Sequence, residues 1–141
     1  MHTEQHIAAF LSGSPHAVVG ASRNREKYGN KVLRAYLQNQ RVVFPVHPSL
    51  DEIEGLPAFR DLASLPQVVH GVSIITPPAV TQRIVADAVK LGIKYLWMQP
   101  GAESEQAVQA AEQAGLHVIW GGPCILVALR FREDASVAGA S

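Results

Sequence analysis

The stretch VVGASRNREKYGNK at positions 18–31 combines a glycine-bounded turn with a concentration of positive charge. Five basic residues lie in it or just after it, with Glu26 as the only acid among them: Arg23, Arg25, Lys27, Lys31 and Arg34. Glycine lets backbone amides approach a ligand closely, and a helix N-terminus adds partial positive charge. With the basic side chains, these features favour the binding of phosphate oxygens. A solvated loop surface is the alternative interpretation of the same charges.

Histidine and cysteine side chains carry weaker signals for chemistry. His47 lies between Val46 and Pro48, so we expect it to pack or to contact a ribose rather than to act as a base. Cys124 follows Gly-Gly-Pro at the expected start of a last helix, where a thiol can be reactive; an inert small core residue is the alternative. No group of Cys, His and carboxylate residues has the spacing of metal ligands, so no metal site is predicted.

Length and composition set the frame for these residues. The chain has 141 residues, 12 Lys and Arg against 12 Asp and Glu, and one cysteine. This length is typical of one domain, and the balanced charge argues against nucleic acid or an anionic membrane as a partner. No signal peptide or membrane-spanning run is evident in the sequence, so we expect a cytoplasmic protein.

Five short apolar runs, rich in β-branched and aromatic residues, predict the strands of a parallel sheet. They are His16–Gly20, Arg41–Val46, Val72–Thr76, Tyr95–Gln99 and His117–Trp120. Stretches with a helical spacing of apolar residues separate them, and this alternation indicates βαβ units. The predicted fold is therefore α/β, with a Rossmann-like, doubly wound five-stranded sheet in the order 3-2-1-4-5, the strands being numbered along the chain.

The expected helices have recognisable ends. The three that cover the sheet are Asn30–Gln40, Pro77–Leu91 with Thr76 as N-cap, and Glu103–Ala114. A helix over Thr3–Leu11 and a short one within Leu56–Leu65 complete the prediction. We expect one ligand-binding domain over residues 1–132 and a flexible tail over residues 133–141.

Right-handed crossovers bring the carboxyl end of every strand to one edge of such a sheet, where ligands bind. Five glycine- or proline-rich turns follow the strands: GASRNREKYG at 20–29, VHPS at 46–49, TPPA at 76–79, QPGAE at 99–103 and GGPC at 121–124. Each turn alone is ordinary for a βα loop. Five of them at one edge indicate a ligand site.

A nicotinamide cofactor is one phosphate ligand to consider. The glycines follow the pattern G-x8-G rather than G-x-G-x-x-G, and the second strand ends in Val-His-Pro rather than in an acid for the ribose hydroxyls. An NAD(P)-binding, oxidoreductase-like module therefore stays an alternative, in which Arg23 or Arg25 would accommodate the additional phosphate of NADP.

An ordered set of motifs gives the chain a resemblance to a known family. VVGAS, YGNKVLRAYL, VVFPVHP, IEGLPAFRDLASLP, SIITPPAV, LWMQPGA and GGPCILV together resemble the small single-domain CoA-binding proteins, which are similar to the CoA-binding domain of the succinyl-CoA synthetase alpha subunit. The resemblance covers residues 5–130 and implies coenzyme A as the ligand. It implies phosphate contacts at Gly20, Ala21, Ser22, Arg23, Lys27 and Tyr28, adenosine contacts at Val46, His47 and Pro48, and a pantetheine arm along Thr76, Pro77, Pro78, Gln99 and Gly101.

The chain also departs from the synthetase. A lysine that helps to hold CoA after the second strand is absent, since this chain reads Ser49-Leu50-Asp51. The charge would then come from Arg23, Arg25 or Lys27. The synthetase carries its phosphorylated histidine in a further domain, so the resemblance implies binding of CoA and does not imply thioester ligation.

We therefore expect a protein that binds CoA or an acyl-CoA and catalyses no reaction alone. A non-catalytic interaction subunit of a larger acyl-CoA enzyme is a further alternative, and homo-oligomerisation or a protein partner stays open. With an oxidant such as diamide, an exposed Cys124 would form a mixed disulfide with the CoA thiol.

Overall fold

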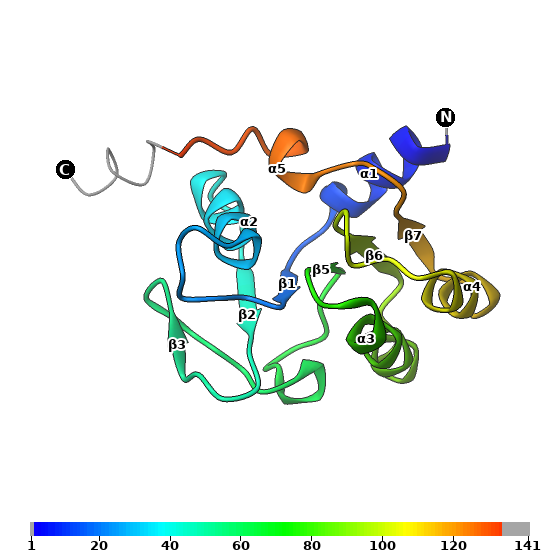
Figure 1. Cartoon of the computed structure of the whole chain (residues 1–141), viewed down its shortest axis with the longest axis horizontal. Helices are drawn as coiled ribbons and strands as arrows, with labels where there is room; N and C mark the ends of the chain where they lie inside the picture. Colours follow the sequence, from blue (N-terminus) through cyan, green and yellow to red (C-terminus); the bar gives the residue numbers. More distant parts are fainter. Residues whose placement is uncertain (1, 134–141) are drawn as a thin grey trace.

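Five parallel strands form the central sheet of the computed structural model, which describes residues 2–133 (Figure 1). They are β1 (His16–Val19), β2 (Val43–Val46), β5 (Gly71–Ile74), β6 (Tyr95–Met98) and β7 (His117–Ile119). Each overlaps one of the predicted apolar runs, and nearly all of the strand residues are buried, because helices cover both faces of the sheet. The predicted α/β class with a five-stranded parallel sheet is confirmed.

The predicted order of the strands is wrong. The observed order is β2-β1-β5-β6-β7, which is 2-1-3-4-5 in the numbering of the predicted strands rather than 3-2-1-4-5. The position beyond β2 is occupied by Phe59, whose N–H donates to the Pro45 carbonyl at 3.0 Å and whose carbonyl accepts from the His47 N–H at 2.8 Å. The third long strand, β5, therefore pairs with the other side of β1, where Ile74 lies opposite Val19.

The connection from β2 to β5 is a hairpin and one tight turn. The hairpin consists of β3 (Glu52–Ile53) and β4 (Leu56–Pro57), and it turns at Glu54 and Gly55, which have φ angles of 53° and 79°. Of the short helix expected within Leu56–Leu65, only the 3-10 turn η1 (Leu62–Ser64) forms. No crossover helix is present in this connection, so the hairpin, the 3-10 turn and their loops make the crossover from β2 to the parallel strand β5 on the far side of β1.

Helices cover both faces of the sheet. α1 (His2–Ser12), α2 (Tyr28–Gln38) and α5 (Ile125–Ala128) pack on one face, and α3 (Pro78–Leu91) and α4 (Glu105–Gln113) pack on the other (Figure 1). Side chains of β1 alternate between the two resulting cores, with Val18 under α2 and with Ala17 and Val19 toward α3 and α4.

The observed helix ends differ from the predicted ones by about one turn or less. α2 begins two residues before Asn30, and α4 begins after its N-cap Ser104, whose Oγ accepts from the Ala107 N–H at 3.1 Å. Thr76 does not cap α3, because Pro77 occupies the N-cap position and the Thr76 hydroxyl instead bonds to the Thr81 hydroxyl at 2.7 Å.

The first residue of the tail expected over residues 133–141 contacts α2. Glu133 forms ion pairs with Lys31 and Arg34, and residues 134–141 lie outside the described residues. Within residues 2–133, no helix has the length and apolar character needed to cross a membrane.

Candidate functional site

A groove with a volume of about 550 Å³ opens at the carboxyl edge of the sheet, between the loop after β1 and the loop after β2. It is lined by Gly20, Ala21, Ser22, Glu26, Lys27, Tyr28, Gly29, His47, Pro48 and Ile75. Seven of the site residues expected from the sequence are among them, namely Gly20, Ala21, Ser22, Lys27, Tyr28, His47 and Pro48. The fold thus brings two segments that are distant in sequence to one groove.

Two glycines allow the elements around the groove to pack closely. Gly20 has a φ angle of 94°, and a Cβ atom there would overlap the carbonyl oxygen of Ile75. A Cβ atom on Gly29 would overlap the carbonyl oxygen of Gly20. The first turn of α2 therefore lies directly against the end of β1, and the N-terminus of this helix faces the groove.

The N-terminus of α2 has no side-chain cap. Lys27 occupies the N-cap position, where Ser, Thr, Asp or Asn would accept a backbone N–H, and it makes no capping bond. Within residues 2–133, no acceptor is bonded to the backbone N–H groups of Tyr28 and Gly29, or to those of Ala21 and Ser22 in the preceding loop. Unbonded amides and a lysine at a helix N-terminus are an arrangement that binds phosphate oxygens.

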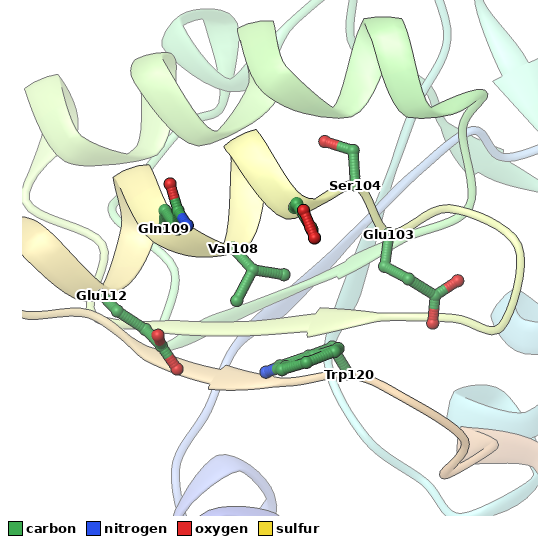
Figure 2. Close-up of a pocket in the computed structure, with 7 residues that line it drawn as sticks. Glu103, Ser104, Val108, Gln109, Glu112 and Trp120 are labelled. Atoms are coloured by element: carbon green, nitrogen blue, oxygen red, sulfur yellow. The ribbon is translucent and has the colours of Figure 1, made fainter.

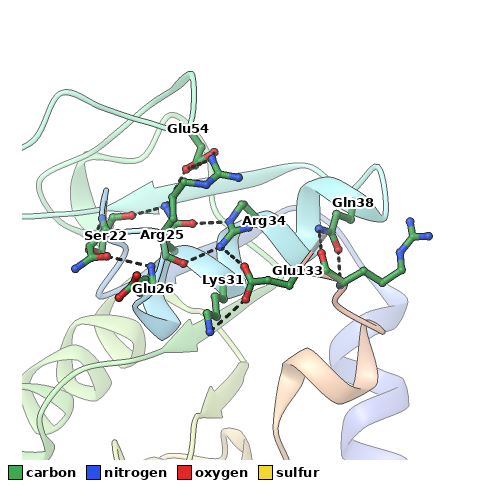
Figure 3. A network of polar contacts seen from close by, with 11 residues as sticks. Ser22, Arg25, Glu26, Lys31, Arg34, Gln38, Glu54 and Glu133 are labelled. Atoms are coloured by element: carbon green, nitrogen blue, oxygen red, sulfur yellow. Dashed lines mark hydrogen bonds and ion pairs between the residues drawn. The ribbon is translucent and has the colours of Figure 1, made fainter. Parts of the chain in front are cut away.

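The five basic residues of the first loop and helix do not form one anion-binding cluster. Arg25 pairs with Glu54 at 2.7 Å, and Lys31 and Arg34 pair with Glu133 at 3.4 Å and 3.2 Å (Figure 3). Glu54 is 29 residues from Arg25, and Glu133 is 99 residues from Arg34, so the local sequence does not reveal either pair. Three of the five cations, Arg25, Lys31 and Arg34, are thus paired with carboxylates of this chain.

Glu133 responds to its two cationic partners. Desolvation acts to raise its pKa, but the hydrogen bonds and charges of Lys31 and Arg34 outweigh this and hold the pKa below the ordinary value. Arg34 is itself buried, and its guanidinium donates to Asn30 Oδ1 at 2.6 Å and to the Arg25 carbonyl at 2.8 Å. Arg34 is therefore a structural residue of the loop.

Lys27 is the cation that remains available at the groove. Among the described residues, no carboxylate pairs with Lys27, which is exposed. Arg23 lies outside the groove lining and donates from Nε to the Glu52 carbonyl at 3.0 Å. Amides and Lys27, rather than a group of arginines, supply the positive potential of the groove.

The β3–β4 hairpin holds the loop after β1, a role that sequence analysis missed. Glu54, at the hairpin turn, accepts at 2.9 Å from the side-chain Nδ2 of the buried Asn30. The same Nδ2 donates to the Ser22 carbonyl at 2.8 Å, so one amide group links the hairpin to both ends of the loop. A detectable signal was the acid Glu54 beside Gly55 at a turn, in a chain with a basic loop elsewhere.

His47 shapes the second wall of the groove. Its Nδ1 accepts from the backbone N–H groups of Ser49 and Leu50, each at 3.1 Å. Because Nδ1 is the acceptor, the proton of the neutral ring lies on Nε2. The ring therefore closes a local turn and leaves Nε2–H as a donor.

A polar hollow of about 410 Å³ adjoins this wall. It shares His47 and Pro48 with the groove and is otherwise lined by Ser49, Leu50, Asp51, Ala58, Phe59, Arg60, Asp61 and Ser64. Arg60 is exposed and has no ion-pair partner among residues 2–133. Arg60 was not among the site residues expected from the sequence, since a short helix was expected within Leu56–Leu65.

The remaining expected site residues lie outside the groove lining. Val46 is 4% exposed and belongs to the core, and Thr76, Pro77 and Pro78 form the entrance to α3. Gly101 lies in the exposed turn after β6. These residues share the carboxyl edge of the sheet with the groove without forming its walls.

Gln99 and Cys124 contact each other beyond the ends of β6 and β7. The buried Gln99 donates from Nε2 to the Cys124 Sγ at 3.3 Å and accepts at Oε1 from the Ile125 N–H at 2.8 Å. Cys124 is half-buried at the N-cap of α5, a helix of four residues. The described contacts of Gln99 thus hold the loop after β7.

Comparisons with known proteins agree on one family. The family model described as CoA binding domain matches residues 15–130. A curated relative, the ADP-forming acetate–CoA ligase I of Archaeoglobus fulgidus, is 24% identical over 113 residues. A solved structure of a conserved hypothetical protein from Pyrococcus furiosus is 43% identical, with a TM-score of 0.76, and the match covers 80% of this chain and 97% of that one.

Some of the similar proteins are much longer. The match covers 73% of this chain but 16% of the Archaeoglobus fulgidus ligase. The dinucleotide-forming acetyl-coenzyme A synthetase 1 from Candidatus Korarchaeum cryptofilum, in its apo form, is 26% identical with a TM-score of 0.68; the match covers 79% of this chain and 27% of the synthetase chain. The chain therefore corresponds to one part of these enzymes.

Proposed function

The chain belongs to the CoA-binding domain family, and on that premise we propose that it binds coenzyme A or an acyl-CoA in the groove between the β1 and β2 loops. The uncapped N-terminus of α2 is the observation that carries the proposal. It presents unbonded amides and Lys27 to a groove, and a pyrophosphate needs such donors.

The groove and the adjoining polar hollow suit different parts of the nucleotide. The pyrophosphate accepts hydrogen bonds from the amides of the loop after β1 and of α2, and it pairs with Lys27. The adenosine lies against His47 and Pro48, with the Nε2–H of His47 as a donor to the ribose. Arg60, in the adjoining polar hollow, supplies the cation for the 3′-phosphate that the absent lysine after the second strand would otherwise provide.

The pantetheine arm leaves the groove along the entrance to α3. Thr76, Pro77 and Pro78 offer a small, largely apolar surface there, and Gly101 lies at the end of the neighbouring strand. Gln99 acts indirectly in this proposal, because its side chain is engaged by Cys124 and Ile125.

Binding without catalysis is the second part of the proposal. His47 is the histidine of the groove, and its Nδ1 is used by two backbone amides, which favours a structural and ligand-contacting role over that of a base. The protein would act as a CoA-binding module, alone or as a subunit of a larger acyl-CoA enzyme.

Thermal unfolding with and without nucleotides tests the proposal. CoA at about 100 times its Kd would stabilise the native state by about 2.7 kcal/mol, which raises Tm on the order of 10 °C for a domain of this size. The ligands to compare are CoA, acetyl-CoA, dephospho-CoA, NAD+, NADP+ and ATP. A shift with NADP+ and none with CoA would overturn the assignment.

Matched variants locate the contacts. Lys27→Ala should weaken CoA binding about tenfold through loss of a charged phosphate contact, whereas Lys90→Ala, an exposed lysine on α3, should leave it unchanged. Arg60→Ala should abolish the preference for CoA over dephospho-CoA. If Arg60→Ala preserves that preference, the 3′-phosphate lies elsewhere.

A further inference from the structure

A second groove, with a volume of about 490 Å³, lies between α4 and the end of β7, at the opposite edge of the sheet from β2 (Figure 2). We call it the Trp120 groove. It is lined by Glu103, Ser104, Glu105, Val108, Gln109, Glu112 and Trp120. None of these residues belongs to the groove proposed for CoA, so the two sites are separate.

Trp120 gives this groove an apolar wall. The Trp120 side chain is 46% exposed, whereas Trp97 is fully buried. Figure 2 shows the indole lying along the strand, across the groove from Val108. An exposed tryptophan at an apolar surface is characteristic of the centre of a protein interface, where tryptophan is enriched.

The groove is also acidic. Glu103, Glu105 and Glu112 line it, and no lysine, arginine or histidine does, so its formal charge is −3 in a chain whose net charge is +0. α4 carries no lysine or arginine, and the ion pairs within residues 2–133 do not involve these carboxylates. Figure 2 shows Glu103 and Glu112 toward opposite ends of the indole.

The acidic wall is held in position by the backbone. Glu103 Oε1 accepts from the Gly101 N–H at 2.7 Å, and Oε2 accepts from the Gly121 N–H at 3.2 Å, so this carboxylate joins the loops after β6 and β7. Ser104 caps α4 beside it. Binding to groups that are already fixed loses less conformational entropy.

We propose that the Trp120 groove binds a basic segment of a partner protein, with an arginine side chain stacked on the indole and paired with the flanking carboxylates. A guanidinium is planar, stacks on aromatic faces and pairs with carboxylates through two N–H groups, so it matches both features of the groove. The groove has the size of a pocket for a few side chains.

A second copy of this chain fits the groove less well. In a two-fold symmetric contact the same patch meets itself, and three carboxylates would then face three carboxylates. Like charges at an interface disfavour the complex, so charge complementarity selects a basic partner.

Acrylamide quenching of tryptophan fluorescence tests the proposal on the intact chain. Since Trp97 is buried, the quenchable emission comes from Trp120. The probe is a synthetic peptide of alternating arginine and leucine, and its control has glutamate in place of arginine. We expect the arginine peptide to protect Trp120 from quenching, with an affinity that falls as salt rises, and the glutamate peptide to give no protection.

Charge-matched variants decide whether the groove is responsible. Glu112→Lys should weaken binding of the arginine peptide about tenfold, and Glu4→Lys, an exposed acid on α1, should not change it. The proposal would be overturned if both peptides protected Trp120 equally, or if the two variants bound the arginine peptide with equal affinity. Self-association of the protein that Glu112→Lys removes would overturn it as well. CoA-induced stabilisation should persist in Glu112→Lys, which separates this test from that of the first groove.

Discussion

His16 should make the stability of the protein depend on pH between about 4 and 6.5. Its side chain is fully buried, Nε2–H donates to the Phe10 carbonyl at 2.8 Å, and Nδ1 has no partner. Burial lowers the pKa from 6.5 to about 4; the bond to Phe10 opposes this, while the charges of Arg41 and His70 add to it. The ring centroids of Phe10 and Tyr36 lie 4.9 Å and 5.2 Å from that of His16, so a proton added to Nδ1 would be buried beside aromatic rings without a hydrogen-bond acceptor.

The sign and size of the effect follow from the two pKa values. Above pH 6.5 the His16 ring is neutral in both the native and the unfolded state, so it does not lower the free energy of unfolding there. As the pH falls from 6.5 to about 4, the unfolded chain binds a proton that the native state does not, so stability decreases by up to about 1.4 kcal/mol per pH unit. The total is about 3 kcal/mol, and below pH 4 no further loss arises from this residue.

Urea unfolding of the protein and of His16→Gln across this range measures the effect. The glutamine keeps an N–H donor for the Phe10 carbonyl but does not titrate. The carboxylates titrate alike in both proteins, so their contribution cancels in the difference between the two free energies of unfolding. The free energy of unfolding of the unsubstituted protein, relative to the variant, should fall by about 3 kcal/mol from pH 7 to pH 4. Parallel pH profiles would refute the reasoning, because His16 would then titrate alike in both states.

Three further predictions concern the loops. Gly29→Ala should abolish CoA binding, because its Cβ would displace the Gly20 carbonyl, whereas Gly115→Ala, where space is open, should cost about 1–2 kcal/mol of stability and leave binding intact by calorimetry. Glu54→Gln should lower stability by less than about 1 kcal/mol and raise CoA affinity, since Arg25 loses its counter-charge. Weaker CoA binding would mean that the contact between the hairpin and the loop contributes more to binding than the freed charge of Arg25 does. With diamide as oxidant, Cys124 and the CoA thiol should each lose hydrogen and join in a disulfide, visible as an added CoA in the intact mass and absent in Cys124→Ser.

The positions of the strands were predictable, and their order was not. An apolar run such as Val72–Thr76 reports that a segment is buried, whichever neighbours it has. The outer side of β2 is occupied by Phe59 through two backbone bonds, so no long strand pairs there. Backbone bonds of this kind leave no pattern in the side chains, so the sequence offered no sign that β5 would pair with β1.

The site was predictable where topology alone determines it. Carboxyl ends of parallel strands meet, and so Gly20 and His47 were expected near each other and line one groove. The charge at the site was not predictable, because the carboxylates that occupy Arg25 and Arg34 come from distant segments. Local sequence gives the number of charges in a loop, whereas only the fold gives their partners.

The bonds at Phe59 also have a consequence for motion. They join His47 to Phe59 and so close residues 47–59 into a small ring, whose closure costs little entropy because it is short. The ring contains the hairpin, in which the Glu52 carbonyl accepts from Arg23 and the Glu54 carboxylate accepts from Arg25, both residues of the loop after β1. We expect this segment to open as one unit while the sheet stays folded, and hydrogen exchange at the amides of His47 and Phe59 measures how often it opens.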